Sequence, residues 1–380
     1  MNRKKLIAFS LSLAMTVVPV TPAAAAGAEQ NSEGLQNAVL DLGFENSLED
    51  SSGKGNNGTL SSGNAEYVDG VVGKALKMNG SSYVNLGTST DLQPENLTLS
   101  FWIRPDTAMT GEELISWNKN EWYTDGWYLS SENDNTPLTL SIGPAKTNGQ
   151  PYRVSVSGKR SDFFPAGEWT HIAVTYDKDS KEICFYRNGV KCSTVTTYGI
   201  SGESTGVLGS DASMEKSVGY NGPKYKGAYL KASLDEYQLY NDVATPEEVI
   251  ALYEESGQTF DRKAVAQADL DKISIPETTQ GNLSLPATGE SGSAISWSSD
   301  NEAVVAADGT VVRPGVGEKD VTVTLTAEAS YLNGEKVTKT YKVTVTAKQE
   351  INITTSSIMG DVTRESRISD RLSTQKEIRE

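Results

Sequence analysis

Histidine and cysteine are almost absent from this chain of 380 residues, which has one histidine, His171, and two cysteines. One histidine excludes a zinc site built from several histidines and leaves a single candidate base for a serine or cysteine triad. Because His171 lies inside the strand-like run GEWTHIAVTYD, we predict that its role is structural. Carboxylate pairs remain the other catalytic option, because glycoside hydrolysis needs only two Asp or Glu side chains, but among 50 acidic residues such pairs occur by chance. The sequence therefore singles out no catalytic residue.

Positive charge is also scarce, because 34 Lys and Arg residues face 50 Asp and Glu residues and leave a net charge of -16. Phosphate binding relies on clustered Lys and Arg side chains, so the composition argues against a nucleic-acid partner. An acidic surface suits a soluble extracellular protein and leaves carboxylates for calcium.

Long hydrophobic runs are missing except at the N-terminus. There, basic residues 3–5 precede an apolar run over residues 6–20, and an Ala-x-Ala pattern follows at residues 24–26. This order predicts a secretory signal peptide of bacterial type over residues 1–26 and a secreted, extracellular protein. The alternative, a membrane anchor, needs about 20 apolar residues, and this run is shorter and interrupted by proline. We expect no membrane insertion after cleavage of the signal peptide.

Short runs with alternating apolar residues recur between residues 39 and 240, separated by Gly, Asn and Ser clusters. LTLSFWIRP, for example, alternates Leu99, Phe101 and Ile103 with outward-facing positions. The spacing predicts an all-β, two-sheet sandwich with these three residues inside. Trp102 and Trp127 lie within such alternation, and we predict that both belong to the core.

One helix follows the last of these runs. Thr245 is the predicted N-cap, Pro246 begins the helix, Glu248 completes a capping box and Gly257 follows the last turn. The helix is therefore predicted from Pro246 to about Glu255.

Five segments together resemble a known family: LDLGFENSLEDSSGKGNNGTL, GKALKMNGSSYVNL, LTLSFWIRPD, GEWTHIAVTYD and ASLDEYQLY with its helix. In this order they resemble the laminin-G-like, concanavalin A-like lectin/glucanase jelly roll, over residues 36–257. The glucanases of this fold carry a Glu-x-Asp-x-x-Glu strand, which is absent here. Asp235 and Glu236 instead match the closing strand of the non-catalytic members. The resemblance therefore implies binding rather than hydrolysis.

The same resemblance implies a calcium site where the first and last strands lie side by side. The residues that match it are Glu45, Asp50, Asn56 and Asp235. An alternative needs no metal, since Asp50 equally suits the capping of the turn DSSG.

A second part follows a polar connector at residues 258–268. Residues 269–347 contain the pieces LP, ISWSS, DGTVVRP and KTYKVTV around a central Trp297. They resemble the atrophied bacterial Ig-like domains of extracellular glycoside hydrolases, arabinan-degrading ones among them. Residues 348–380 contain no aromatic residue, and we expect this tail to be disordered.

Sugar recognition needs flat aromatic faces together with amides and carboxylates that bind hydroxyl groups. Two segments predicted as loops, WNKNEWYTDGWY and VGYNGPKYKGAY, supply both kinds of group. The candidate carbohydrate-binding residues are Trp117, Trp122, Tyr123, Asp125, Tyr220, Asn221 and Tyr225. The alternative is that these rings form a partly buried lid over the sandwich.

The two cysteines flank a tight turn, and the length of that turn decides their relation. A two-residue Asn188-Gly189 turn places Cys184 and Cys192 on opposite sheet faces, whereas a three-residue loop places them directly across from each other. Export to an oxidising compartment favours the second arrangement, so we predict a Cys184–Cys192 disulfide.

Three functions remain compatible with the sequence. The first is a secreted, monomeric, non-catalytic module that binds extracellular polysaccharide through one rim of the jelly roll. The second is the accessory N-terminal part of a glycoside hydrolase whose catalytic domain is absent from this chain. The third is a surface adhesin that recognises another protein.

Overall fold

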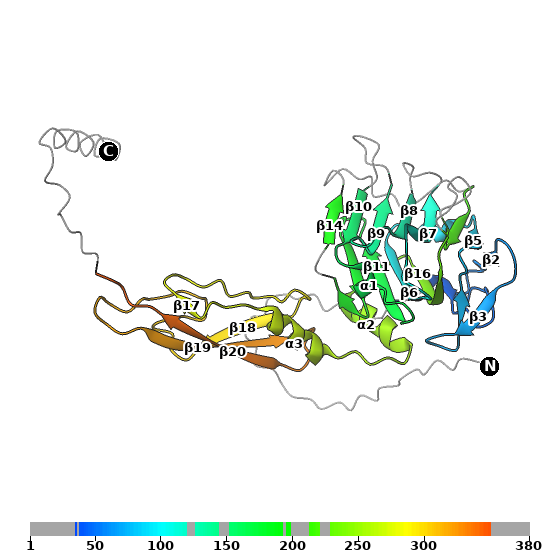
Figure 1. Cartoon of the computed structure of the whole chain (residues 1–380). Coiled ribbons are helices and arrows are strands. Elements are labelled where there is room, and N and C mark those ends of the chain that lie inside the picture. The colour runs from blue at the N-terminus through cyan, green and yellow to red at the C-terminus, as the bar shows by residue number, and fades with distance from the viewer. Residues whose placement is uncertain are drawn as a thin grey trace, which may run out of the picture. The chain divides into compact units, whose positions relative to one another are not determined.

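The computed structural model describes residues 35, 38–119, 126–143, 152–192, 195–198, 213–220 and 229–350. They form two large β-sheets, followed along the chain by a smaller four-stranded sheet (Figure 1). The predicted all-β class is confirmed. The predicted signal peptide at residues 1–26 lies outside the described residues, as does the predicted tail from residue 351 onward.

Both large sheets are antiparallel. Sheet A contains, in spatial order, β13 (Val190–Lys191), β12 (Ile183–Arg187), β11 (Thr170–Tyr176), β6 (Leu97–Pro105), β16 (Ala232–Tyr240), β4 (Lys74–Lys77) and β3 (Glu66–Asp69), with β1 (Ala38–Leu42) also paired to β16. Sheet B contains β14 (Val195–Tyr198), β10 (Tyr152–Val156), β9 (Leu138–Ile142), β8 (Gly126–Ser131), β7 (Glu113–Lys119), β15 (Lys216–Val218), β5 (Val84–Gly87) and β2 (Thr59–Leu60).

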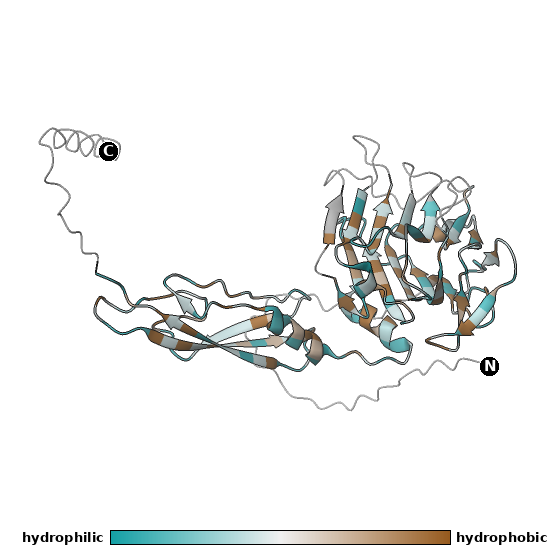
Figure 2. Ribbon diagram, viewed as in Figure 1, coloured by the Kyte–Doolittle hydropathy of each residue, from teal (hydrophilic) through white to brown (hydrophobic). Residues whose placement is uncertain are grey.

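The main hydrophobic core lies between these two sheets. Alternation along each strand sends every second side chain into it, and Leu99, Phe101 and Ile103 of β6 are all buried there as predicted. Figure 2 shows the apolar positions as brown segments between paler and teal ones along the strands. Trp127 also belongs to this core, as predicted.

Short helices connect or cover the strands. They are η1 (Thr90–Leu92), α1 (Arg160–Phe163), α2 (Pro246–Glu255) and α3 (Arg262–Lys272). In α2, Glu248 N donates to Thr245 Oγ1 (3.2 Å) and Thr245 N donates to Glu248 Oε2 (2.8 Å), which is the predicted capping box. Gly257 has a positive φ of 82° directly after the helix, as a C-terminal stop requires. Val249 of α2 packs against Ala173 of β11, so this helix covers part of the outer face of sheet A.

The predicted disulfide is wrong because the hairpin between β12 and β13 has a two-residue turn. Asn188 and Gly189 both have positive φ, and Arg187 pairs with Val190. Cys192 N then donates to Phe185 O (2.8 Å), one position away from Cys184. Cys192 packs against the core between the sheets, Cys184 lies on the side of α2, and both thiols are free.

The smaller sheet has the order β17 (Thr278–Thr279), β20 (Val337–Val345), β19 (Val321–Ser330) and β18 (Ala294–Ser299). Trp297 of β18 lies 5.5 Å from Tyr341 of β20 between ring centroids, and its Nε1 donates to Pro286 O (2.9 Å). The predicted connector, residues 258–268, is not all extended chain, because α3 begins at Arg262 and packs Ala266 and Leu270 against this sheet.

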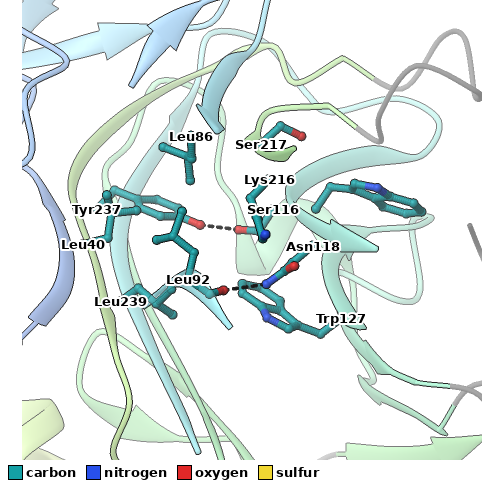
Figure 3. Close-up of a pocket in the computed structure, with 11 residues that line it drawn as sticks. Leu40, Leu86, Leu92, Ser116, Asn118, Trp127, Lys216, Ser217, Tyr237 and Leu239 are labelled. Atoms are coloured by element: carbon teal, nitrogen blue, oxygen red, sulfur yellow. Dashed lines mark hydrogen bonds between the residues drawn. The ribbon is translucent and has the colours of Figure 1, made fainter. Parts of the chain in front are cut away.

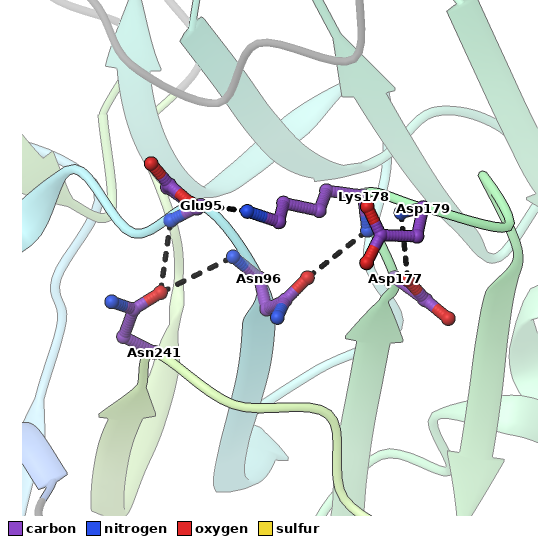
Figure 4. Close-up of polar contacts among 6 residues, drawn as sticks. All are labelled: Glu95, Asn96, Asp177, Lys178, Asp179 and Asn241. Carbon is purple, nitrogen blue, oxygen red and sulfur yellow. Dashed lines mark hydrogen bonds and ion pairs between the residues drawn. The ribbon is translucent and has the colours of Figure 1, made fainter.

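Hydrogen bonds join three loops at one end of sheet A (Figure 4). Asn241 Oδ1 accepts from Glu95 N (2.9 Å) and Asn96 N (3.2 Å), and Asn96 Oδ1 accepts from Lys178 N (3.0 Å). Lys178 and Glu95 also form an ion pair. These side-chain oxygens serve as internal acceptors that hold the loops after β5, β11 and β16 together.

Candidate saccharide-binding surfaces

The interior of the sandwich has almost no room for a ligand. The cavity in Figure 3, between the sheets, has a volume of about 10 Å³, which is about enough for one water molecule. Two hydrogen bonds lie in its walls, one between Ser116 Oγ and Tyr237 Oη (2.6 Å) and one from Asn118 Nδ2 to Leu92 O (2.7 Å), whereas the buried Nε1 of Trp127 has no partner. This cavity is therefore too small for a saccharide, and the outer faces of the described sheets are the candidate surfaces.

Of the seven predicted binding residues, the structure describes Trp117 and Tyr220. The others lie outside the described residues: Trp122, Tyr123, Asp125, Asn221 and Tyr225. The placement of Trp117 in a loop is wrong, because β7 continues to Lys119 and pairs Trp117 with Tyr128 of β8. The two rings stack at 5.4 Å on the outer face of sheet B, and each side chain is 1% exposed. Trp117 therefore forms part of the floor of this face.

Tyr220 is the middle ring of a three-tyrosine stack. Its centroid lies 4.8 Å from that of Tyr83 and 4.4 Å from that of Tyr229, and both pairs are nearly parallel. Both faces of Tyr220 are thus covered by other rings. In this arrangement Tyr220 has no face for a sugar, whereas Tyr83 and Tyr229 are only half-buried.

The two strands that carry the described parts of the predicted aromatic segments, β7 and β15, are neighbours in sheet B. Ser217 of β15 pairs with Trp117 of β7, and the two strands run antiparallel. Gly219 N donates to Ile115 O (2.9 Å), four residues before β7 ends at Lys119. Four residues of strand span about 13 Å. The chain therefore leaves β7 and β15 at opposite ends of the sheet.

A row of polar side chains crosses the outer face of sheet B beside Trp117 and Tyr128. Two rows run across β8, β9 and β10. Strand pairing places Tyr128, Ser141 and Arg153 side by side in the first row. It places Ser130, Thr139 and Ser155 side by side in the second row. We call the following residues the polar face: Ser130, Glu132, Thr139, Ser141, Arg153 and Ser155. The sequence signal for this face was the polar half of the alternation in WYLSS, LTLSIG and YRVSVSG.

Two hydroxyl groups of the polar face lack hydrogen-bond partners. Ser130 Oγ and Ser141 Oγ are buried without a partner, whereas Thr139 Oγ1 and Ser155 Oγ bond each other (2.7 Å). Arg153 forms an ion pair with Glu132 through Nη2, and its buried Nε has no partner. The side chains of this pair are 34% and 19% exposed, so solvent reaches them.

The predicted calcium ligands fall into two sets of contacts. Asp50 accepts from Asp41 N (3.0 Å), Ser52 N (2.9 Å) and Asn56 N (2.8 Å), which organises its own loop. Hydrogen bonds from these backbone groups and from the Ser52 hydroxyl outweigh burial and lower the pKa of Asp50.

Asp235 and Glu45 instead hold the loop between β3 and β4. Asp235 Oδ2 accepts from Val71 N (2.7 Å) and Val72 N (3.0 Å), and Glu45 Oε2 accepts from Lys74 N (3.2 Å). Burial raises the pKa of Asp235 to about 6. Protein donors thus occupy the carboxylate oxygens of Asp50 and Asp235, and this arrangement does not fit one calcium ion.

No group of three or more His, Cys, Asp or Glu side chains is placed to hold a metal within the part of the chain that the structure describes. Calcium binding by this protein stays a prediction.

His171 is fully buried between Trp102 and Tyr253, at centroid distances of 5.2 and 5.7 Å. Its Nε2 lies 2.9 Å from Ser100 Oγ, and its Nδ1 has no partner. A nucleophilic triad needs a carboxylate at the second ring nitrogen, which this pair lacks. Burial lowers the pKa of His171 to about 3, so the ring is neutral at ordinary pH. This position agrees with the predicted structural role.

These features define the class of protein, a two-sheet jelly roll with a helix-covered face and a polar face, followed by a small Ig-like sheet. Residues 78–250 match the family model of the concanavalin A-like lectin/glucanases superfamily, and residues 263–348 match that of the atrophied bacterial Ig domain. The chain therefore carries a concanavalin A-like domain followed by an atrophied bacterial Ig domain, as predicted.

Among curated proteins, the chain is similar to an α-L-arabinofuranosidase of Bifidobacterium longum subsp. longum. The two are 39% identical over 110 residues, which cover 23% of this chain and 10% of that protein. The chain thus spans about a tenth of the length of this relative.

Two solved structures show a remote likeness. One is domain 4 of AbnA, a GH43 extracellular arabinanase from Geobacillus stearothermophilus, in complex with arabinotriose. The two sequences are 23% identical, the match covers 58% of this chain and 100% of that chain, and the TM-score is 0.41. The other is the binding domain of Paraclostridial Mosquitocidal Protein 1, at 17% identity, 79% and 82% coverage and a TM-score of 0.42. Likeness at this level carries no inference about a ligand. Within the described residues, no helix has the length and apolar character needed to cross a bilayer.

Proposed function

We propose that this chain is a secreted, non-catalytic carbohydrate-binding protein whose polar face on sheet B contacts an extracellular polysaccharide. The observation that carries the proposal is the pair of buried, unpartnered hydroxyls, Ser130 and Ser141, beside the Arg153–Glu132 ion pair. A buried polar group without a partner costs about 1–3 kcal/mol. A sugar hydroxyl both donates and accepts, so a glycan that displaces what covers these two side chains, which are 0% exposed in this structure, supplies the missing partners.

The remaining groups of the polar face suit the same ligand. Arg153 and Glu132 offer donors and acceptors that solvent reaches, and neighbouring strands about 4.8 Å apart repeat polar groups across the face. The Trp117–Tyr128 stack forms a rigid floor beside them. A carbohydrate, with hydroxyls at similar intervals, matches this pattern better than an apolar ligand does.

Charge-neutral double substitutions test the polar face. In affinity gels that contain arabinan, xylan or β-glucan, we expect Glu132→Gln with Arg153→Gln to weaken binding about 10-fold or more, because both charge-assisted contacts to the glycan disappear. The matched control is Lys263→Gln with Glu335→Gln, which removes an exposed ion pair at α3 of the Ig-like part and leaves the net charge equally unchanged. Equal migration of both variants and the wild type would contradict the proposal.

A second variant separates binding from folding. Ser130→Ala with Ser141→Ala removes two hydroxyls that have no partner, so thermal stability should stay the same or rise. If the hydroxyls contact glycan, binding nevertheless falls. Unchanged binding would mean that the two serines have no part in the site.

A second candidate function is an accessory module of a glycoside hydrolase that acts on arabinan. The similarity to an α-L-arabinofuranosidase favours it. Stronger retardation by arabinan than by xylan or β-glucan supports this candidate, whereas equal retardation speaks against it. Release of arabinose by the purified chain would contradict the non-catalytic part of both proposals.

A further inference from the structure

A cavity of about 350 Å³ opens on the outer face of sheet A beside α2. We call it the Trp169 pocket. Its lining consists of Trp102, Trp169, Asn188, Tyr253, Gln258, Gly70 and Val71. Its volume falls in the range of small-ligand sites, roughly 300–1,000 Å³.

Trp102 is buried, as predicted, but it lies outside the hydrophobic cluster between the two sheets. Phe101 and Ile103 point into the core between the sheets, so Trp102 points to the outer face of β6. It is 4% exposed because Tyr253 of α2 stacks on it at 5.4 Å with the rings 27° apart. With His171 on another side, Trp102 is a fixed part of the pocket wall.

Trp169 supplies a second aromatic wall. It is half-buried just before β11, and the Arg104 guanidinium lies 4.8 Å from its ring centroid. This cation–π contact restricts the movement of the Trp169 ring, and Arg104 itself does not line the cavity. A ring held in this way loses little conformational freedom when a ligand stacks on it.

The polar groups of the pocket are amides. Asn188 Oδ1 accepts from His171 N (2.9 Å), which fixes the side chain so that its amide nitrogen remains to donate. Gln258 is exposed at the rim and offers a donor and an acceptor. A larger residue at Gly70 would force a shift of the surrounding atoms, because an added Cβ would lie 2.4 Å from Asp235 Oδ2.

No lining residue carries a formal charge. Aromatic walls with neutral amides match a ligand that has apolar C–H faces and hydroxyl groups. A phosphorylated or cationic ligand would find no counter-ion in the lining.

We infer that the Trp169 pocket is a second binding site, which takes one or two units of a neutral saccharide. The site lies on the opposite outer face of the sandwich from the polar face, and the main core separates the two. This second site therefore goes beyond the proposed function, and either site can bind saccharide without the other.

Intrinsic tryptophan fluorescence of the full chain tests the inference. The probes are the neutral trisaccharides arabinotriose, xylotriose and cellotriose, with trigalacturonic acid as the acidic counterpart. We expect a saturable change with at least one neutral trisaccharide and none with the acidic one. Trp169→Ala should abolish the change, and Trp169→Phe, which keeps a stacking ring, should retain binding measured by calorimetry.

A further variant distinguishes loss of binding from loss of folding. Gln258→Ala alters an exposed side chain and should leave the unfolding temperature unchanged while weakening trisaccharide binding about 10-fold, which is about 1.4 kcal/mol. Lys263→Gln with Glu335→Gln, which removes an exposed ion pair outside both surfaces, should leave the fluorescence titration unaltered. Three results would overturn the inference: no saturable change with any neutral trisaccharide, full binding by Trp169→Ala, or full binding by Gln258→Ala.

Discussion

Asp235 gives the sharpest test of how this fold uses a buried charge. Its side chain is 0% exposed and accepts from three backbone N–H groups, those of Val71, Val72 and Glu236. Burial outweighs these hydrogen bonds and raises its pKa from the usual 3.8 to about 6, and the nearby Glu45 adds to the shift. The folded protein thus holds the Asp235 proton more tightly than the unfolded chain does.

The sign of the effect on stability follows from this difference. Well below pH 3.8, the pKa of this carboxyl in the unfolded chain, the group is protonated in both states, and its full contribution to stability is present. As the pH rises through 6, the buried carboxyl of Asp235 ionises in the folded protein, and its contribution to the free energy of unfolding is lost. A shift of about two pKa units corresponds to about 3 kcal/mol, which is roughly 6–12 °C in unfolding temperature for a domain of this size.

Asp235→Asn removes the charge and keeps the shape. Between pH 4 and pH 7.5, in the presence of a chelator, the stability of the wild type relative to this variant should fall by about 2 kcal/mol, because part of the full effect is already lost at pH 4. Chemical denaturation at a series of pH values measures that difference. Asp177→Asn is the control, and its relative stability should stay nearly constant between pH 4 and pH 7.5. The backbone N–H of Asp179 lowers the pKa of Asp177, so the contribution of this carboxylate is lost only as the pH falls further.

A relative stability that stays constant or rises between pH 4 and 7.5 would refute the reasoning about Asp235. The same samples test the calcium prediction. If Asp235 helps to bind calcium, excess calcium at pH 7.5 raises the unfolding temperature of the wild type but not of Asp235→Asn. Equal unfolding temperatures with calcium and with chelator would contradict calcium binding.

Two further predictions concern the hairpin and the helix. Under denaturing, non-reducing conditions, a thiol assay should count two free thiols per chain, since Cys184 and Cys192 lie on opposite faces; a count of zero would restore the disulfide. Thr245→Ala removes the side-chain half of the capping box of α2 and should cost about 1 kcal/mol of unfolding free energy, whereas Thr245→Ser should restore most of it. Equal stability of Thr245→Ala and the wild type would show that the cap contributes nothing.

The sequence predicted the elements that local chemistry determines. The capping box, Pro246 and Gly257 fix α2 within a stretch of about a dozen residues, and the structure reproduces these bounds. Alternation along β6 likewise predicted which side of the strand enters the core. Both signals depend on neighbours along the chain, so neither needs knowledge of the sheet order.

The cysteine prediction failed for a different reason. Both turn lengths were compatible with ICFYRNGVKCS, and the expected oxidising compartment decided between them. The backbone instead follows the preference of Asn-Gly for a two-residue turn, because both residues tolerate positive φ. A local conformational preference outweighed an argument from the environment, and one residue of register moved the two thiols to opposite faces.

Neither candidate surface could be placed from the sequence, because both depend on which strands lie side by side. The polar face needs the order β8, β9, β10, and the Trp169 pocket combines residues between 70 and 258 through the order β11, β6, β16, β4. Alternation along a strand also predicts that every outward residue contacts solvent. Helix α2 instead covers part of the outer face of sheet A, so Trp102 lies in the wall of the Trp169 pocket.

Two surfaces on opposite outer faces impose a geometric limit on binding. A short oligosaccharide cannot reach both, because the main core lies between the two sheets. A polysaccharide network offers many segments, so one molecule can engage two of them at once. The second contact then benefits from a high local concentration, and the gain appears only with the polymer. Any excess of polymer affinity over trisaccharide affinity should therefore shrink when either surface is removed, without a change in the intrinsic affinity of the other.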